Sequence, residues 1–200
     1  MIVSLLKIWY GNSTVIWLKS DRKAIAGLYA VFIAYGLAVC GIRRKRAMEI
    51  ERKFLIEKLP EDLGQYPVWC LEQAYLCREP VIRVRKEEYK EKKEFILTYK
   101  SDGLMEREEY NLPLTQESYL HLKAKADGRI ITKKRYRIPE KSGLMIELDI
   151  FEGDLEGLIM AEVEFPDKET ANAYQPPEWF GKEVTFDKTY HNSNLSKGKE

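Results

Sequence analysis

From residue 48 onward, charged and apolar residues alternate at every second position through most of the chain. Side chains of a β-strand point alternately to its two faces, so this period predicts strands with one charged and one apolar face. Turn-forming glycine, proline and aspartate residues separate the segments. Eight such strands predict a mainly β fold of the α+β kind, an eight-stranded antiparallel β-barrel or tunnel with flanking helices. We expect the strands at residues 49–57, 69–78, 81–89, 93–101, 104–112, 129–138, 143–152 and 158–166.

Two short helical segments interrupt the strands. Thr115 precedes Q-E-S-Y-L-H-L-K, and Asp167 precedes K-E-T-A-N-A-Y. Threonine and aspartate are favoured N-cap residues, because their side-chain oxygens accept hydrogen bonds from backbone amides of the first helical turn. We therefore expect a helix to begin directly after each of these two residues.

Residues of like charge share one face of several strands. Two unit charges ~7 Å apart, the spacing of alternate strand residues, repel by about 2.4 kcal/mol at an effective dielectric constant of about 20. An ordinary solvated surface does not require this repulsion, whereas a site for a highly charged ligand does. Cationic strands suit an anion and anionic strands suit a cation, so both together indicate a polyanion bound with a divalent metal. The pairs are Arg83 with Arg85, Lys133 with Arg135, Glu147 with Asp149, and Glu162 with Glu164.

The alternation alone does not decide which face of the barrel is inside. With the charges inside, the barrel is a binding tunnel whose apolar outer face is covered by helices or by a partner. With the charges outside, it is an ordinary small barrel. The net charge of +1 provides no global field that would select nucleic acid. Neither a P-loop nor a Ser-His-Asp arrangement is visible, and we interpret His121 and His191 as incidental.

Glu49 begins the run E-I-E-R-K-F-L-I, which resembles the E-x-E-x-K signature of the CYTH, or triphosphate tunnel metalloenzyme, family, and in particular its bacterial inorganic triphosphatases. Further family segments follow in the same order, from residue 48 to about residue 195. One departure is Ala74, where the family usually has glycine, and we expect its methyl group to affect a turn or substrate access. The segments are Q-A-Y-L at 73–76, V-I-R-V-R-K at 81–86, L-T-Y-K-S at 97–101, R-E-E-Y at 107–110, K-K-R-Y-R-I-P at 133–139, I-E-L-D-I-F at 146–151, A-E-V-E-F at 161–165 and W-F-G-K-E-V-T at 179–185.

The resemblance implies a tunnel with inward-pointing charges that binds a triphosphate with Mg²⁺ or Mn²⁺. It implies that Tyr75 is a proton acceptor and that Lys53 is a catalytic residue as well as a phosphate ligand. Planar guanidinium groups suit phosphate, and hard divalent cations prefer carboxylate oxygens. The implied phosphate-binding residues are Lys53, Arg83, Arg85, Lys100, Arg107, Lys133 and Arg135. The implied metal ligands are Glu49, Glu51, Glu147, Asp149, Glu162 and Glu164.

The function that we expect is metal-dependent hydrolysis of a small-molecule triphosphate, with inorganic triphosphate giving pyrophosphate and phosphate. The alternatives are a class IV-type adenylate cyclase, a thiamine triphosphatase, or a non-enzymatic polyphosphate-binding module. A module that only binds polyphosphate could dispense with the carboxylates, so the retention of all six acidic positions favours an enzyme. No nucleic-acid partner is expected, and an apolar barrel exterior would leave a surface for a homodimer.

The first 47 residues lie outside the resemblance. Residues 24–42 carry no charge, and nineteen residues in a helix can just cross a ~30 Å hydrocarbon layer. Four basic residues follow at 43–46, which would place the main domain in the cytoplasm. Two interpretations stay open: a membrane anchor, or a start assigned upstream of a true first residue at Met48. The expected division is an extension at 1–47, a tunnel domain at 48–195 and a polar tail at 196–200.

Overall fold

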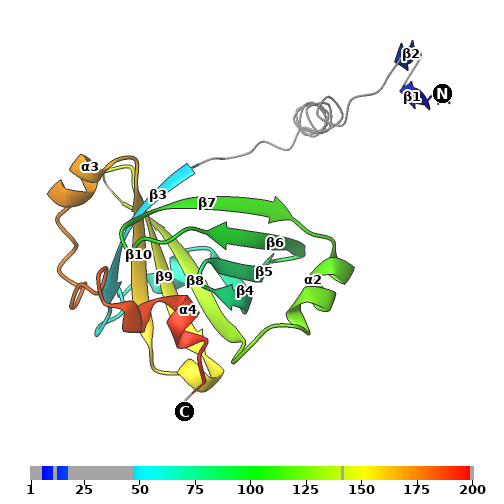
Figure 1. Ribbon diagram of the computed structural model, residues 1–200. Coiled ribbons are helices and arrows are strands. Elements are labelled where there is room, and N and C mark those ends of the chain that lie inside the picture. The colour runs from blue at the N-terminus through cyan, green and yellow to red at the C-terminus, as the bar shows by residue number, and fades with distance from the viewer. Residues whose placement is uncertain (1–5, 11–12, 18–46, 141, 199–200) are drawn as a thin grey trace. The chain divides into compact units, whose positions relative to one another are not determined.

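The structure is a computed structural model of the 200-residue chain, and it describes residues 6–10, 13–17, 47–140 and 142–198 (Figure 1). Contacts divide the chain into two compact units, Met1–Arg43 and Arg44–Glu200. In the first unit, β1 (Leu6–Tyr10) pairs with β2 (Ser13–Trp17) as an antiparallel hairpin. The expected membrane span at 24–42 lies outside the described residues. Among the residues that are described, no helix is both long and apolar enough to cross a membrane.

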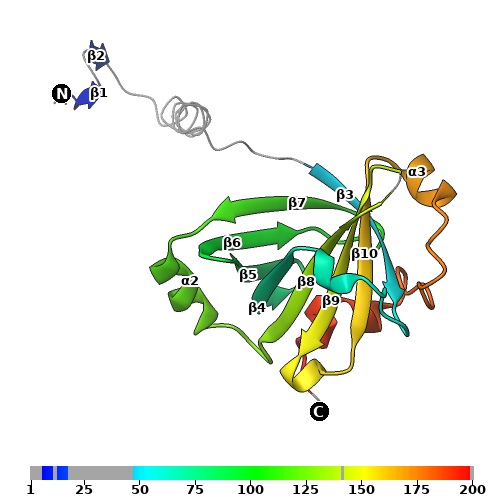
Figure 2. The same cartoon turned by 180° about the vertical axis from the view of Figure 1, so that it is seen from behind.

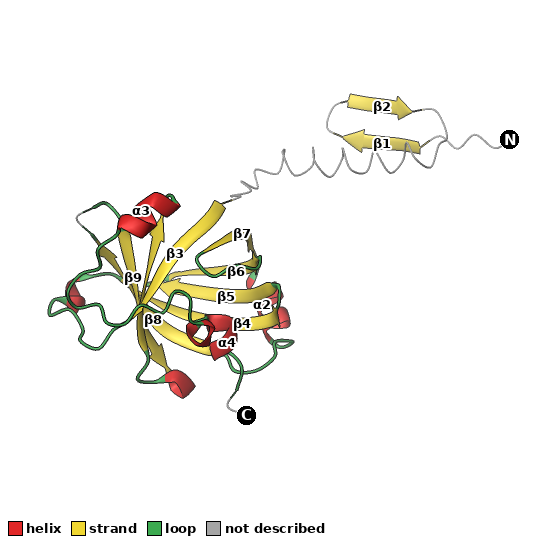
Figure 3. Cartoon of the chain, turned by 60° about the vertical axis from the view of Figure 1, so that its left-hand side comes forward, coloured by secondary structure: helices red, strands yellow, loops and turns green. Residues whose placement is uncertain are grey.

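The second unit is a closed antiparallel barrel, as predicted (Figure 3). The order of strands around the barrel is β10-β3-β7-β6-β5-β4-β8-β9. Each observed strand agrees with its expected range to within two residues at either end, because the alternation that predicted it is local. The strands are β3 (Ala47–Leu55), β4 (Val68–Arg78), β5 (Val81–Tyr89), β6 (Lys92–Lys100), β7 (Glu106–Pro113), β8 (Ile131–Pro139), β9 (Met145–Glu152) and β10 (Ile159–Phe165).

The charged faces of the strands point inward. On β3, Glu49, Glu51 and Lys53 line a central cavity, whereas the alternate residues Ile50 and Phe54 are buried in an apolar cluster on the outside. An apolar exterior would be unfavourable in water, so it requires a cover. The chain supplies one from its connecting helices and its C-terminal segment, and of the two arrangements compatible with the alternation, the tunnel is the correct one.

Two helices cover this apolar exterior (Figures 1 and 2). α2 (Gln116–Lys123) packs on β4, β5 and β6, and α3 (Lys168–Ala173) packs on β3 and β10. Both begin as expected: the Thr115 hydroxyl accepts a hydrogen bond from the Ser118 amide at 3.2 Å, and the Asp167 carboxylate accepts one from the Thr170 amide at 2.7 Å. Three shorter turns of 3-10 helix are η1 (Leu63–Gln65), η2 (Gly153–Leu155) and η3 (Lys188–Tyr190), and α4 (Asn192–Leu195) follows the last.

Ala74 belongs to this exterior and not to the tunnel. Its methyl group is fully buried with Val84 and with Tyr119 of α2. The expectation that this methyl would affect a turn or substrate access is therefore wrong, because Ala74 lies within β4 and on its outward face. The methyl group packs beneath a helix instead.

One end of the barrel is filled with apolar side chains. Tyr75, Ile131, Phe151 and Met160 are all at most 2% exposed there, and Leu195 of α4 packs against them. The C-terminal segment also extends the wall between β3 and β7, which pair only from Ala47 to Ile50. Beyond that point β3 exchanges backbone hydrogen bonds with residues 181–184. The tunnel is consequently blind at this inner end.

Gly128 lets the C-terminal segment lie close against the barrel, because it has no Cβ. Its φ is +76°, and a Cβ there would clash with the Ser196 carbonyl oxygen and crowd the Arg78 guanidinium. We expect Gly128→Ala to lower the free energy of unfolding by about 1–3 kcal/mol, measured by urea denaturation. Gly157→Ala is the matched control, because Gly157 also has a positive φ, +94°, but a Cβ there would meet nothing within 4 Å. Equal losses in the two variants would contradict this role.

Candidate active site

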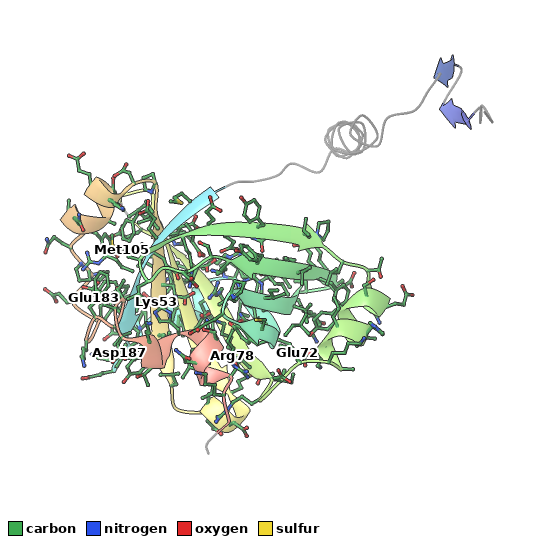
Figure 4. All side chains as sticks on the ribbon, viewed as in Figure 1. Lys53, Glu72, Arg78, Met105, Glu183 and Asp187 are labelled. Atoms are coloured by element: carbon green, nitrogen blue, oxygen red, sulfur yellow. The ribbon has the colours of Figure 1, made fainter. Side chains whose placement is uncertain are left out.

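The inward charges surround a cavity of about 490 Å³, a size typical of small-ligand sites. Every residue that the sequence predicted for the site lines this cavity except Lys133 and Asp149. The cavity reaches solvent at the end opposite the apolar plug, where the side chain of Met145 is 42% exposed. We call this end the tunnel mouth. Figure 4 shows the side chains that fill the barrel, with Lys53 among them.

The wall formed by β5 carries two cations, Arg83 and Arg85, on the face that lines the cavity. Burial lowers the pKa of Arg83, but Tyr75 and the charge of Glu109 outweigh burial and raise it. Arg83 is buried, donates to the Gln73 side-chain oxygen at 3.2 Å, and has no carboxylate within 4 Å among the described residues. Its neighbour Arg85 contacts Glu87 at 2.8 Å, yet burial and the like charge of Arg83 lower the pKa of Arg85. A buried guanidinium beside a second, partly buried one is stabilised when an anion lies between or beside them. This wall therefore has the charge and the burial that suit an anion.

Lys53 lies at the centre of a second charged group. Its ammonium contacts Glu51 at 2.9 Å and donates a hydrogen bond to Glu162. Burial lowers the pKa of Lys53, but the charges of Glu162 and Glu51 outweigh burial and hold the pKa above its ordinary value. Arg107 contacts Glu51 and, at 3.0 Å, Glu49. Each carboxylate here is thus held by at least one cation.

Arg135 joins the two halves of the site. Its guanidinium donates two hydrogen bonds of 2.6 Å to Asp149 and one of 2.7 Å to Glu162, and it also contacts Glu147. Asp149 is fully buried and accepts a further bond from Lys133. Burial, partly offset by Asp149, lowers the pKa of Lys133 to about 8. Lys133 and Asp149 therefore lie inside the barrel but do not line the cavity: the Lys133 ammonium is 5.0 Å from the Phe151 ring of the apolar inner end, and Asp149 holds Arg135 in place.

Several lining residues were missed by the sequence interpretation. Glu87 follows Arg83 and Arg85 on the same face of β5, so the alternation could have found it. Glu109, 2.8 Å from Lys100, likewise shares a face with Arg107. Asn111 follows on that face and also lines the cavity. All three positions had a period-two signal. Glu109 also lay within the R-E-E-Y segment at 107–110, whereas Glu87 and Asn111 lay outside every family segment.

His191 had no such signal. It was interpreted as incidental, yet it is 7% exposed and lines the cavity from the C-terminal segment. Its Nε2 lies 3.4 Å from the Thr185 carbonyl oxygen. Burial and then the charge of Lys53 lower its pKa. The C-terminal segment has no regular alternation, so the position of His191 at the cavity can be recognised only in the folded structure.

The acidic residues have the chemistry of a divalent metal site. Glu164, near the mouth, has no basic partner in the part of the chain that the structure describes. Although Glu164 is an exposed residue, partial desolvation of its carboxylate and the negative charges of Glu49 and Glu147 raise its pKa, which indicates a position where a cation is favoured. Oxygen donors of this kind fit Mg²⁺ or Mn²⁺. Within the described ranges no three acidic, histidine or cysteine side chains already converge on one point, because most of these carboxylates face cations of the protein.

Comparison with known proteins agrees with this geometry. No family model matches the chain. Over 148 residues it is 37% identical to an inorganic triphosphatase of Nitrosomonas europaea, covering 74% of this chain and 96% of that protein. It is 32% identical over 151 residues to an inorganic triphosphatase of Acetivibrio thermocellus, covering 74% of this chain and 93% of that one. A crystal structure of an inorganic triphosphatase matches with a TM-score of 0.55 and 36% identity, covering 75% of this chain and 95% of that one. With such relatives matched over nearly their whole length, and with a closed barrel of inward charges, the chain belongs to the CYTH, or triphosphate tunnel metalloenzyme, family.

Proposed function

We propose that this protein hydrolyses inorganic triphosphate to pyrophosphate and phosphate inside the tunnel. The observation that carries the proposal is the segregation of charge around one cavity. Arg83, which has no carboxylate within 4 Å among the described residues, and Arg85, whose pKa is lowered, form one wall, and Glu164 lies among carboxylates near the mouth. A polyanion accompanied by a divalent cation would neutralise both. The relatives that are named inorganic triphosphatases support the choice of substrate.

Substrate binding would exchange partners within the site. In the free tunnel, Lys53, Arg107 and Lys100 are paired with carboxylates of the protein. Phosphate oxygens would replace the carboxylates as partners of these cations and would also contact Arg83, Arg85 and Arg135. Charge-assisted hydrogen bonds to phosphate are strong, and guanidinium groups can make two at once. This preorganised set of cations would hold the triphosphate in line and stabilise negative charge in the transition state.

The metal would be held by the carboxylates that this exchange releases and by Glu164, which has no basic partner among the described residues. They are Glu49, Glu51, Glu147, Glu162 and Glu164, all of which line the cavity. Asp149 was expected among the ligands, but its buried bonds to Lys133 and Arg135 fit a supporting role better. A bound Mg²⁺ or Mn²⁺ would neutralise charge that develops on the phosphate oxygens.

Tyr75 would orient the attacking water. It lines the cavity at the inner end, is 2% exposed, and its hydroxyl lies 3.4 Å from the Gln73 side-chain oxygen. Water would attack the terminal phosphorus, and the bond to the bridging oxygen would break with its electron pair leaving on pyrophosphate. The proton lost by the water would pass to a nearby carboxylate, while the Tyr75 hydroxyl orients the water by a hydrogen bond and Lys53 stabilises the charge on the transferred group. Anchoring through residues 24–42, a cytoplasmic location and a homodimer remain predictions from the sequence.

The test is phosphate release by the full chain. We would compare inorganic triphosphate, ATP and thiamine triphosphate, each with Mg²⁺, with Mn²⁺ or with a chelator. We expect rapid release from inorganic triphosphate with metal and none with chelator. Binding of triphosphate without any release would instead favour a polyphosphate-binding module, and faster release from either organic triphosphate would reject inorganic triphosphate as the preferred substrate.

A further inference from the structure

Two aromatic rings stack on the inward face of the barrel near the tunnel mouth. Trp69 of β4 and Tyr89 of β5 have ring centroids 4.5 Å apart and an interplanar angle of 22°. Trp69 lies directly opposite Arg135 of β8, so the ring shares the face of the cavity cations. Figure 3 shows β4, β5 and β8 as neighbours in this wall. Neither ring lines the cavity itself, whose wall is mostly polar and charged, so the stack requires an explanation.

The stack supports Arg137. The Arg137 guanidinium carbon lies 4.3 Å from the Trp69 ring centroid, a distance at which a cation is attracted to the ring face. Arg137 also lines the cavity. Its nearest carboxylates are Glu147 at 3.3 Å and Glu87 at 4.0 Å, and its Nε is buried without a hydrogen-bond partner. These contacts are looser than the bonds of 2.6 Å that Arg135 makes, so the Trp69 ring and Glu147 together hold this guanidinium.

Arg137 lies between Arg135 and the tunnel mouth, where an entering phosphate chain would meet it. It follows Arg135 by two residues on the same face of β8, about 7 Å nearer to the mouth. Because the inner end of the tunnel is filled by apolar side chains, a substrate has to enter past the mouth. The side chain of Arg137 is 36% exposed, whereas that of Arg135 is 8% exposed, so a phosphate chain arriving from solvent meets Arg137 first.

We propose that Arg137, held on Trp69, binds the phosphate group nearest to the tunnel mouth, and that Trp69 is a positioning residue that acts through Arg137. The inference rests on the proposed function, because it requires a phosphate chain in the tunnel. A contact at the mouth is present in the bound ground state and in the transition state alike. Its loss therefore raises KM and leaves kcat nearly unchanged, whereas loss of an inner cation lowers kcat.

The test is a double-mutant cycle with inorganic triphosphate and metal. We expect Arg137→Gln to raise KM about tenfold with kcat within about twofold of wild type, and Arg137→Lys to recover only part of the loss, because an ammonium lacks the planar fork. Trp69→Leu should raise KM similarly, and Trp69→Phe should raise it less. Adding Trp69→Leu to Arg137→Gln should have little further effect, since both remove one interaction. Lys134→Gln is the control, because Lys134 is exposed on the outer face of β8, 3.0 Å from Glu152.

Three results would overturn the inference: a wild-type KM for Arg137→Gln, a fall in kcat as large as the rise in KM, or additive effects of the two substitutions. If wild type fails to hydrolyse triphosphate, the proposed function fails, and calorimetric binding of inorganic triphosphate to the same variants then decides the inference. Weaker binding by Arg137→Gln and by Trp69→Leu, without additivity, would support it. Unchanged binding in the variants, or no binding to wild type, would overturn it.

Discussion

Lys53→Ala is expected to lower kcat for inorganic triphosphate by about 100- to 1000-fold, the effect typical of removing one preorganised group that stabilises transition-state charge. Lys53 is 3% exposed and faces the cavity between Glu51 and Glu162. The variant should stay folded, because Glu51 keeps its contact with Arg107 and Glu162 keeps its contact with Arg135. Phosphate-release kinetics at saturating substrate and metal measure the effect.

Circular dichroism and thermal melting of Lys53→Ala separate lost chemistry from lost folding. Lys134→Ala is the matched control: it removes the same charge from the outer face of β8, at an exposed ion pair with Glu152. We expect near wild-type kcat for that control. A kcat within threefold of wild type for folded Lys53→Ala would remove Lys53 from the proposed mechanism.

Arg135→Met is expected to have the largest effect on stability, lowering the free energy of unfolding by about 3–5 kcal/mol. Arg135 is buried and contacts Asp149, Glu147 and Glu162, so its loss leaves buried negative charge with fewer partners. Methionine keeps much of the side-chain length and removes the charge. Urea denaturation without divalent cations measures the loss.

A divalent cation should restore part of this lost stability, because a ligand that binds only the folded state stabilises it. We expect Mg²⁺ or Mn²⁺ to raise the urea midpoint more for Arg135→Met than for wild type, since the variant frees carboxylates to bind the ion. Arg137→Met is the control: Arg137 is partly exposed and makes looser contacts, so its loss should cost less than about 1 kcal/mol. Equal stabilities of Arg135→Met and wild type would mean that Arg135 does not balance these carboxylates.

Much of the fold could be predicted because its signals are local. Period-two alternation identified all eight barrel strands, and Thr115 and Asp167 marked the starts of α2 and α3. The same alternation placed Arg83 with Arg85 and Glu162 with Glu164 on common faces, which was enough to infer a polyanion with a metal. The strand that begins at Glu106 was expected slightly early, because the turn before it contains Gly103 with a φ of +143°.

The candidate site was predictable only in part. Alternation tells which face of a strand a side chain is on, but not whether that side chain reaches the cavity or lies deeper in the barrel. Lys133 and Arg135 share a strand face, yet Lys133 is bonded to Asp149 at the apolar inner end of the barrel and only Arg135 lines the cavity. His191 reaches the cavity because residues 181–184 bond to β3 across more than a hundred residues of sequence. Neither placement follows from the spacing of residues along the chain.

The sequence by itself determined the strands, the charged and apolar faces of each, and the residue types suited to a triphosphate and a metal, because side-chain direction in a strand depends only on neighbouring residues. Only the tertiary structure decided that the charges point inward, which cations keep carboxylate partners, and that Arg137 lies on Trp69 near the mouth. Those features arise when the barrel closes and its register brings distant strands together. The free energy of burying the apolar faces under α2, α3 and the C-terminal segment stabilises that closure.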